Sequence, residues 1–187
     1  MIKLKIEKKI VSEKSPIFYI AEAGVNHNGS IEIAKKMIDV AKKAGADAIK
    51  FQSFNTKEII IPKGPKAKYH NETVGIKKSW FELLKSQEMS FKMHKALINH
   101  CKKKKIIFLS TPYDYASAAM LNRLKVGAFK IASTDNDNFP LIEKIIKFNK
   151  PILISTAMTN FKEIKENILF LKKKKFKKYL IFQCTGN

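Results

Sequence analysis

Residues 106–132 read IIFLSTPYDYASAAMLNRLKVGAFKIA, and this stretch decides the fold class. It begins with an apolar run over 106–110 that is typical of a buried strand, and it ends with a second apolar run over 128–132. The segment between them, 114–124, is amphipathic and predicts a helix. A strand, a helix and a strand joined by short connections form the repeating unit of a parallel α/β sheet. The stretch therefore predicts one such unit.

The same unit repeats on both sides of this stretch. Further strands are expected at 17–21, 46–51, 151–155 and 179–183, and further helices after Ser30, before Lys104, at 139–148 and at 160–171. Ser90 is expected to cap the second half of the helical stretch that ends near Lys104, and Asn160 with Glu163 forms a capping-box pattern. A connection as long as 53–78 is uncommon and is often functional.

Two α/β architectures compete for this pattern: an open doubly wound sheet and a (β/α)8 barrel. The chain has no GxGxxG motif after its first long strand, which weakens the dinucleotide-binding version of the open sheet. A barrel has eight units, typically in about 250 residues, and this chain supplies about six. We therefore expect an incomplete TIM (β/α)8-type barrel of the α/β class, preceded by a short strand or hairpin at 3–11.

The composition fits a folded domain. The length of 187 residues predicts about one domain, and 45% apolar and 28% charged residues are typical of a chain that folds. No apolar run approaches the roughly 18 residues of a membrane span, and the first residues lack the apolar core of a secretory signal. Cys101 and Cys184 form neither a disulfide framework nor a CxxC pair. These features predict a cytoplasmic protein with no membrane partner.

The net charge of +21 raises nucleic acid as a partner. However, Arg123 is the only arginine among 37 cationic residues, and specific DNA readers rely on the arginine fork. The lysines are spread along the chain, and the runs 102–105 and 172–175 fall where cations favour a helix C-terminus. We therefore expect solvated helix faces and no specific nucleic-acid site.

Polar side chains stand where each expected strand ends, which is where parallel α/β proteins place their chemistry. Two lysines lie inside apolar strands, where burying an ammonium is costly unless an anion is present. Serine and threonine hydroxyls at neighbouring strand ends could each cap a turn, but together with the lysines they predict an anion site. The residues at these ends are Glu22, Lys50, Gln52, Ser110, Thr111, Lys130, Ser133, Asp135, Ser155, Thr156, Gln183 and Thr185.

The histidines do not form a metal-binding pattern. His27 lies in an Asn-His-Asn-Gly turn and is expected to pack beneath the site, and His94 is expected on a helix or at the surface. The chain contains no HxH or HExxH pair, so no complete metal site is expected within it.

Seven motifs occur in an order that resembles the N-acetylneuraminate (sialic acid) synthase family, whose relatives include pseudaminic and legionaminic acid synthases. They cover about residues 17–187. They are IAEAGVNHNGS at 20–30, IKFQ at 49–52, LSTPY at 109–113, FKIAS at 129–133, NFPL at 138–141, LISTAM at 153–158 and QCT at 183–185.

The resemblance implies a TIM barrel followed by a small antifreeze-like domain, usually in a domain-swapped homodimer. It implies an enzyme, a transferase that condenses phosphoenolpyruvate with the open-chain aldehyde of an N-acetylated hexosamine. The product is a nine-carbon sialic-acid-type sugar, and phosphate is released. A divalent metal, Mn²⁺ or Mg²⁺, is expected to polarise the aldehyde in the full-length family, with its ligands outside this chain.

The resemblance also assigns roles to residues. Lys50, Thr111, Lys130, Ser133 and Ser155 should hold phosphoenolpyruvate, with Ser110 beside them in the anion site derived above. Glu22 should act as acid or base, and Asp135 as a second catalytic carboxylate. Gln52 and, in the long connection, Asn71 should contact the sugar.

The resemblance ends after the sixth expected strand, at residue 187. We therefore expect residues 1–187 to be the N-terminal portion of a synthase barrel, without the last strands and the antifreeze-like domain, and to have little activity alone. Two alternatives remain open. Lys130 could be the nucleophile of a Schiff-base aldolase, or the chain could be a non-catalytic fragment that docks on a partner.

Overall fold

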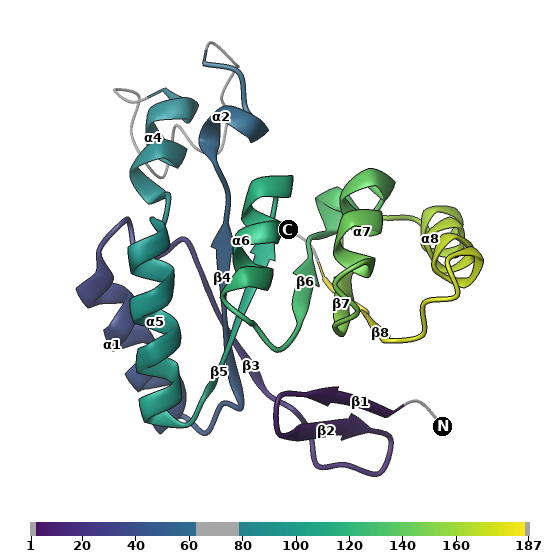
Figure 1. Ribbon diagram of the computed structural model, residues 1–187, viewed down its shortest axis with the longest axis horizontal. Coiled ribbons are helices and arrows are strands. Elements are labelled where there is room, and N and C mark those ends of the chain that lie inside the picture. The colour runs from purple at the N-terminus through teal and green to yellow at the C-terminus, as the bar shows by residue number, and fades with distance from the viewer. Residues whose placement is uncertain (1–2, 63–78, 186–187) are drawn as a thin grey trace.

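The computed structural model of the protein describes residues 3–62 and 79–185 (Figure 1). Its strands are β1 (Lys3–Ile6), β2 (Lys9–Ser12), β3 (Ile20–Gly24), β4 (Ala48–Ser53), β5 (Ile107–Pro112), β6 (Phe129–Ile131), β7 (Ile152–Ser155) and β8 (Tyr179–Phe182). Its helices are α1 (Ile31–Lys43), α2 (Thr56–Ile59), α4 (Trp80–Gln87), α5 (Phe91–Lys104), α6 (Tyr115–Arg123), α7 (Phe139–Ile146) and α8 (Phe161–Lys173), with a 3-10 turn η1 (Ser133–Asp135).

Strands β3 to β8 form a parallel half-barrel. β3, β4 and β5 pair in that order, β6, β7 and β8 pair in that order, and β5 lies beside β6. The helices that follow the strands pack along one side of this curved wall (Figure 1). β1 and β2 form an antiparallel hairpin ahead of it. The expected incomplete barrel with a preceding hairpin is therefore confirmed.

Alternation along the strands separates two apolar layers. In each strand one alternating set, with residues such as Phe51 and Ile131, packs outward against the helices in the larger cluster. The other set, with residues such as Ala48 and Leu109, faces the inside of the half-barrel, where Ile6 of the hairpin joins it and is fully buried. Because successive side chains of a strand point to opposite faces, this pattern also fixes which polar residues face the inside.

The helix ends follow their capping residues. Ser90 accepts a hydrogen bond from the Met93 amide at the start of α5, so the expected helical stretch is two helices, α4 and α5. Asn160 and Glu163 form the expected capping box of α8. Within the described residues, no helix has the length and apolar character needed to cross a bilayer.

The strand expected at 17–21 is shifted, and that prediction was wrong in its bounds. β3 begins at Ile20, and Ile17 and Tyr19 are 71% and 58% exposed. The Tyr19 amide donates to the Asp47 carboxylate over 2.9 Å, and the Tyr19 carbonyl accepts from the amides of Asp47 and Ala48. These bonds hold residues 17–19 at the amino end of the sheet, ahead of the strand. The continuous apolar run therefore did not predict burial at Ile17 and Tyr19.

Candidate functional site

An ion pair lies on the inner face of the half-barrel, near the carboxyl ends of β3 and β4. Lys50 is 7% exposed, and its Nζ lies 2.8 Å from Oε1 of Glu22. The Glu22 side chain is 60% exposed, so only one member of the pair is buried. A buried ammonium needs an anionic partner. Glu22 meets this need while its carboxylate stays open to solvent.

Gly24 lies beside the side chains of Glu22 and Gln52. Gly24 has a φ of +54°, and a bulge separates it from Glu22 in the pairing of β3 with β4. A side chain at this position would meet Glu22 Oε1 at 3.5 Å and Gln52 Nε2 at 3.9 Å. The left-handed backbone, which favours glycine, therefore leaves space beside two residues that the sequence placed in the site.

Lys130 is the second cation on the inner face. Its Nζ donates hydrogen bonds to the Ser155 hydroxyl of β7 and, over 3.0 Å, to the Ile131 carbonyl, and it lies 5.4 Å from the centre of the Phe182 ring. Burial, and then the positive charge of Lys50, lower the pKa of Lys130 to about 8. An anion bound on this face would favour the charged form of Lys130, which burial and the charge of Lys50 oppose.

Thr111 contributes a hydroxyl to the same face. It pairs with Gln52 in the register of β4 with β5, one alternation beyond the pair of Lys50 with Leu109. Thr111 is 1% exposed, and no hydrogen bond reaches its buried Oγ1 from the described residues. An unpaired buried hydroxyl is costly. The Thr111 hydroxyl is thus available to a ligand in the half-barrel.

Ser110 lies on the opposite face of β5. Its hydroxyl is 2.6 Å from Ser53 Oγ, which is 2.7 Å from His94 Nε2, and His94 Nδ1 is 2.9 Å from the Ser90 carbonyl. A carbonyl can only accept, so Nδ1 carries the proton, Nε2 accepts from Ser53, and Ser110 donates to Ser53. The structure therefore does not bring Ser110 to the lysines.

His94 is also more buried than its position on a helix suggested. It is 1% exposed, and burial lowers its pKa despite its hydrogen bond to Ser90. His27 is fully buried beneath the site, accepts from the Gly29 amide over 3.0 Å and lies against Phe51, as expected for a turn residue. Burial and the charge of His94 lower the pKa of His27.

The turn that carries Asp135 is held against β7 by buried amides. Asn136 donates to the Ser155 carbonyl over 2.6 Å, and Asn167 of α8 donates to the Asn136 carbonyl over 2.8 Å. Burial raises the pKa of Asp135, although a hydrogen bond from Asn138 opposes the shift. Ser133, in the same turn, lines a separate small cavity on the side of α8.

A cavity of about 810 Å³ opens beyond the lysines, between β4, β5, η1 and the helices α2 and α4. Gln52 and Asp135, both expected at the site, line it together. Tyr113, which sequence reasoning did not select, lines it as well; its place directly after the Thr-Pro end of β5 was the available signal. The lining also includes an apolar group, Phe54, Ile59, Trp80, Leu83 and Leu84, together with the polar Glu58 and Gln87 of the helical segments.

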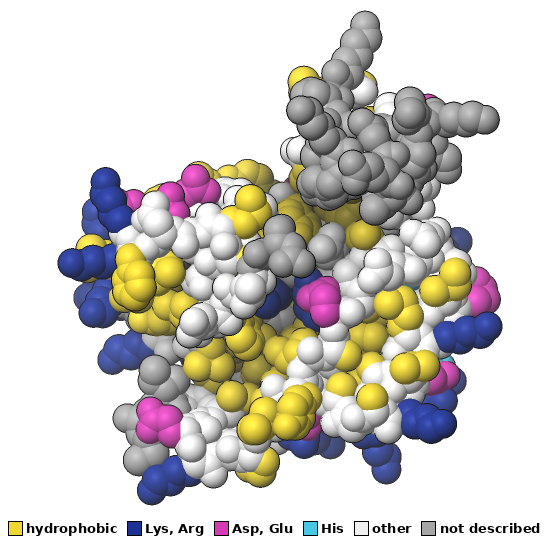
Figure 2. Space-filling model, turned by 180° about the vertical axis from the view of Figure 1, so that it is seen from behind, with side chains coloured by type: hydrophobic (Ala, Val, Ile, Leu, Met, Phe, Trp, Pro, Cys, Tyr) yellow, Lys and Arg dark blue, Asp and Glu magenta, His cyan; other side chains and the backbone are white. Residues whose placement is uncertain are grey.

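The inner face is hollow and mostly apolar. Figure 2 shows this face from behind, with hydrophobic side chains along the hollow and basic and acidic side chains meeting near its middle. The half-buried residues around the inner cluster include Phe18, Ile20, Leu180 and Phe182. An apolar surround strengthens the attraction between the charged groups and an anionic ligand.

Cys184 follows β8 near the Lys130–Ser155 pair. Burial alone would raise the pKa of its thiol, but hydrogen bonding from Ser155 and the backbone of Thr156 lowers it. The charge of Lys130 acts in the same direction, and the pKa lies below the ordinary value. The sequence assigned no role to Cys184 beyond its place in the motif at 183–185, and the structure adds its position beside Lys130 and Ser155.

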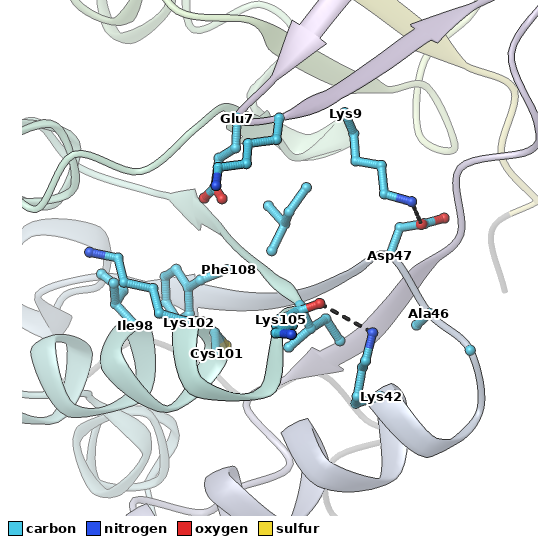
Figure 3. A pocket seen from close by; sticks show the side chains of 14 residues that line it. Glu7, Lys9, Lys42, Ala46, Asp47, Ile98, Cys101, Lys102, Lys105 and Phe108 are labelled. Atoms are coloured by element: carbon cyan, nitrogen blue, oxygen red, sulfur yellow. Dashed lines mark hydrogen bonds and ion pairs between the residues drawn. The ribbon is translucent and has the colours of Figure 1, made fainter.

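A second cavity, of about 790 Å³, lies at the opposite, amino end of the strands (Figure 3). Several lysines line it, and two of them make contacts that tie neighbouring segments together. Lys9 pairs with Asp47 at 2.8 Å, and Lys42 donates to the Lys105 carbonyl at the end of α5 over 3.2 Å. Cations at a helix C-terminus are favoured by its dipole. These two contacts therefore stabilise the amino end of the half-barrel.

The described residues do not assemble a metal site. Within residues 3–62 and 79–185, no three histidine, cysteine or carboxylate side chains lie together as metal ligands would. Glu22 pairs with Lys50, and Oδ1 of Asp135 accepts a hydrogen bond from Asn138, whereas the buried Oδ2 of Asp135 has no hydrogen-bond partner among the described residues. Asn71, expected to contact the sugar, lies outside the described residues.

Comparisons with known proteins agree with one another. A model described as the NeuB family matches residues 37–187. An N,N'-diacetyllegionaminic acid synthase from Campylobacter jejuni is 45% identical over 168 residues, which are 89% of this chain and 50% of that protein. The spore coat polysaccharide biosynthesis protein SpsE from Bacillus subtilis is 37% identical over 166 residues, 89% of this chain and 44% of that protein.

A solved structure has the same arrangement. The N-acetylneuraminic acid (sialic acid) synthetase from Leptospira borgpetersenii superimposes with a TM-score of 0.83 at 31% identity, covering 99% of this chain and 60% of that one. The chain therefore spans about half the length of the curated relatives it matches.

Proposed function

Because the chain belongs to the NeuB family, we propose that residues 1–187 form the N-terminal portion of a synthase barrel and bind phosphoenolpyruvate on its inner face. The proposed reaction condenses phosphoenolpyruvate with an N-acetylated hexosamine to give a nine-carbon sialic-acid-type sugar. The names of the legionaminic acid synthase and the sialic acid synthetase support this class of reaction.

One observation carries the proposal. Two lysines, Lys50 and Lys130, lie on the inner face of an apolar half-barrel, although each is costly to bury there. Thr111 offers an unpaired hydroxyl on the same face, and Ser155 already bonds to Lys130. A ligand with a phosphate and a carboxylate supplies the negative charge and the acceptors that this arrangement lacks.

The chemistry can be written from these groups. The C3 carbon of phosphoenolpyruvate forms a bond to the aldehyde carbon of the sugar, a water oxygen adds at C2, and phosphate leaves as the C2–O bond breaks. Lys50 and Lys130 would neutralise the phosphate as it leaves. Glu22, open to solvent beside Lys50, would accept a proton from the attacking water and return it to the aldehyde oxygen, which becomes a hydroxyl. The new C2 hydroxyl would give its proton to the departing phosphate as the C2 carbonyl forms.

Among the described residues, no three potential ligand side chains lie together as a metal site would need. The divalent metal implied by the resemblance would be held by residues beyond this half-barrel. We propose that turnover also needs the further strands that the longer relatives have, since catalysis depends on groups held in a closed site. Homodimerisation and a cytoplasmic location stay predictions from the sequence.

Calorimetric titration of the chain with phosphoenolpyruvate tests the proposal. Wild type should bind, and Lys50→Met and Lys130→Met should each weaken binding by about 10-fold or more, because each removes a charge-assisted bond. Lys9→Met, at the amino end of the barrel, is the matched control and should bind as wild type does. A wild-type chain without affinity, or lysine variants that bind normally, would sink the proposal.

A second candidate is a Schiff-base aldolase. The pKa of about 8 favours it, since more of Lys130 is a free amine near neutral pH than for an ordinary lysine. Borohydride reduction in the presence of pyruvate would trap a Schiff base on Lys130 as a stable mass increase. Absence of that adduct, together with phosphoenolpyruvate binding, would leave the synthase as the function.

A further inference from the structure

The cavity of about 810 Å³ combines the Tyr113 hydroxyl with a group of apolar side chains. Tyr113 lines this cavity beside Asp135 and Gln52. Its ring is fixed by an edge-on contact with Phe54, with ring centres 6.3 Å apart and an interplanar angle of 77°. Within the described part of the chain, no hydrogen bond joins its hydroxyl to another residue.

The electrostatic surroundings keep this hydroxyl a donor. Burial, and then the negative charges of Asp135 and Glu22, raise the pKa of Tyr113 to about 12. The phenol therefore keeps its proton at neutral pH, and it can donate to a neutral oxygen.

The apolar residues that line the same cavity indicate what that oxygen belongs to. Leu83 and Leu84 of α4 and Ile59 of α2 present methyl groups to the cavity. A plain sugar hydroxyl would satisfy the donor but not the apolar wall. An acylamino group has a carbonyl oxygen that accepts a hydrogen bond and, next to it, a methyl group that gains from leaving water.

We propose that Tyr113 is a specificity-determining residue that donates a hydrogen bond to the acyl carbonyl of the sugar's acylamino group, whose methyl packs against the wall formed by Ile59, Leu83 and Leu84. This inference rests on the proposed function, because it takes the second substrate of that reaction to be an N-acetylated hexosamine. It goes beyond the proposed function by naming Tyr113 as the residue that distinguishes an N-acetylated sugar from a sugar without the acyl group.

Titrations with two sugars test it. The chain, saturated with phosphoenolpyruvate, is titrated with N-acetylmannosamine and separately with mannose. Wild type should prefer N-acetylmannosamine. Tyr113→Phe keeps the ring and its contact with Phe54, and it should weaken N-acetylmannosamine binding by about 10-fold while changing mannose binding less than about twofold. Its affinity for phosphoenolpyruvate should equal that of wild type.

Tyr19→Phe is the matched control, since Tyr19 is exposed at the amino end of the sheet and bonds through its backbone. Three outcomes overturn the inference: wild type without a preference between the sugars, Tyr113→Phe with unchanged N-acetylmannosamine affinity, or an equal loss for both sugars. Failure of the proposed function gives a different result, because the wild-type chain would then not bind phosphoenolpyruvate at all.

Discussion

The Nζ atom of Lys50 lies 2.8 Å from a carboxylate oxygen of Glu22, with the lysine buried and the carboxylate largely open to solvent. The pair is therefore unequal: the lysine depends on the glutamate for its charge balance, whereas the glutamate can be hydrated without the lysine. An incoming anion would share or replace this balance, which makes the pair sensitive to ligand binding.

Glu22→Gln should raise the affinity of the chain for phosphoenolpyruvate by a few-fold. The substitution removes a negative charge that repels the ligand's phosphate, and it leaves Lys50 without its anionic partner. Both effects should strengthen binding of the anion. The thermal midpoint of the unliganded variant should lie below that of wild type. Phosphoenolpyruvate should raise the midpoint of the variant by more than it raises that of wild type. Calorimetry and melting curves measure both effects. Weaker binding in this variant would show that Glu22 contacts the ligand favourably.

Phosphoenolpyruvate affinity should fall as the pH rises through about 8, because Lys130 loses its proton there instead of near its ordinary value of 10.5. The affinity for phosphoenolpyruvate measured at pH 7 should exceed that at pH 9 for wild type. For Lys130→Met the two affinities should be equal. A wild-type affinity that stays constant across this range would argue that Lys130 carries no charge important for binding.

The unliganded chain should respond to pH in the opposite direction. The folded-state pKa of Lys130 is lowered, so between about 8 and 10.5 the unfolded chain binds more protons than the folded one, and this group makes stability rise with pH. Urea unfolding of wild type and Lys130→Met at pH 8 and pH 10 isolates the contribution. The increase in the free energy of unfolding between pH 8 and pH 10 should be larger in wild type than in Lys130→Met.

Ser110→Ala should destabilise the chain without affecting ligand binding. Its hydroxyl donates to Ser53 within the buried Ser53–His94 network, and loss of one such hydrogen bond costs about 1 kcal/mol. Thr111→Val is the matched comparison on the inner face; it should weaken phosphoenolpyruvate binding. Weaker binding in Ser110→Ala as well would restore the role that the sequence assigned to this serine.

Cys184 should react with iodoacetamide faster than Cys101. The thiolate is the reacting form, and the pKa of Cys184 is lowered while burial, followed by the charges of Glu7 and Asp39, raises that of Cys101 to about 12. Phosphoenolpyruvate should slow the reaction, since Cys184 lies beside the Lys130–Ser155 pair. Peptide mass analysis after timed labelling separates the two sites, and equal labelling would contradict the expected contrast.

Much of the molecule could be predicted because its signals are local. The alternation of strands and helices, the caps at Ser90 and Asn160 and the half-barrel class depend on residues near one another in the sequence. The lysines inside apolar strands pointed to a charged site for the same reason, since burial of an ammonium needs an explanation wherever it occurs.

The sequence by itself thus determined the order of the elements, the parallel half-barrel and the presence of two cations at its strand ends. Only the tertiary structure decided which neighbours share a face: Thr111 points inward and Ser110 outward, because pairing register selects one of two alternating sets. It also buried His94 and brought Tyr113 to the cavity of Asp135. These placements depend on contacts between distant segments, which a local pattern does not contain.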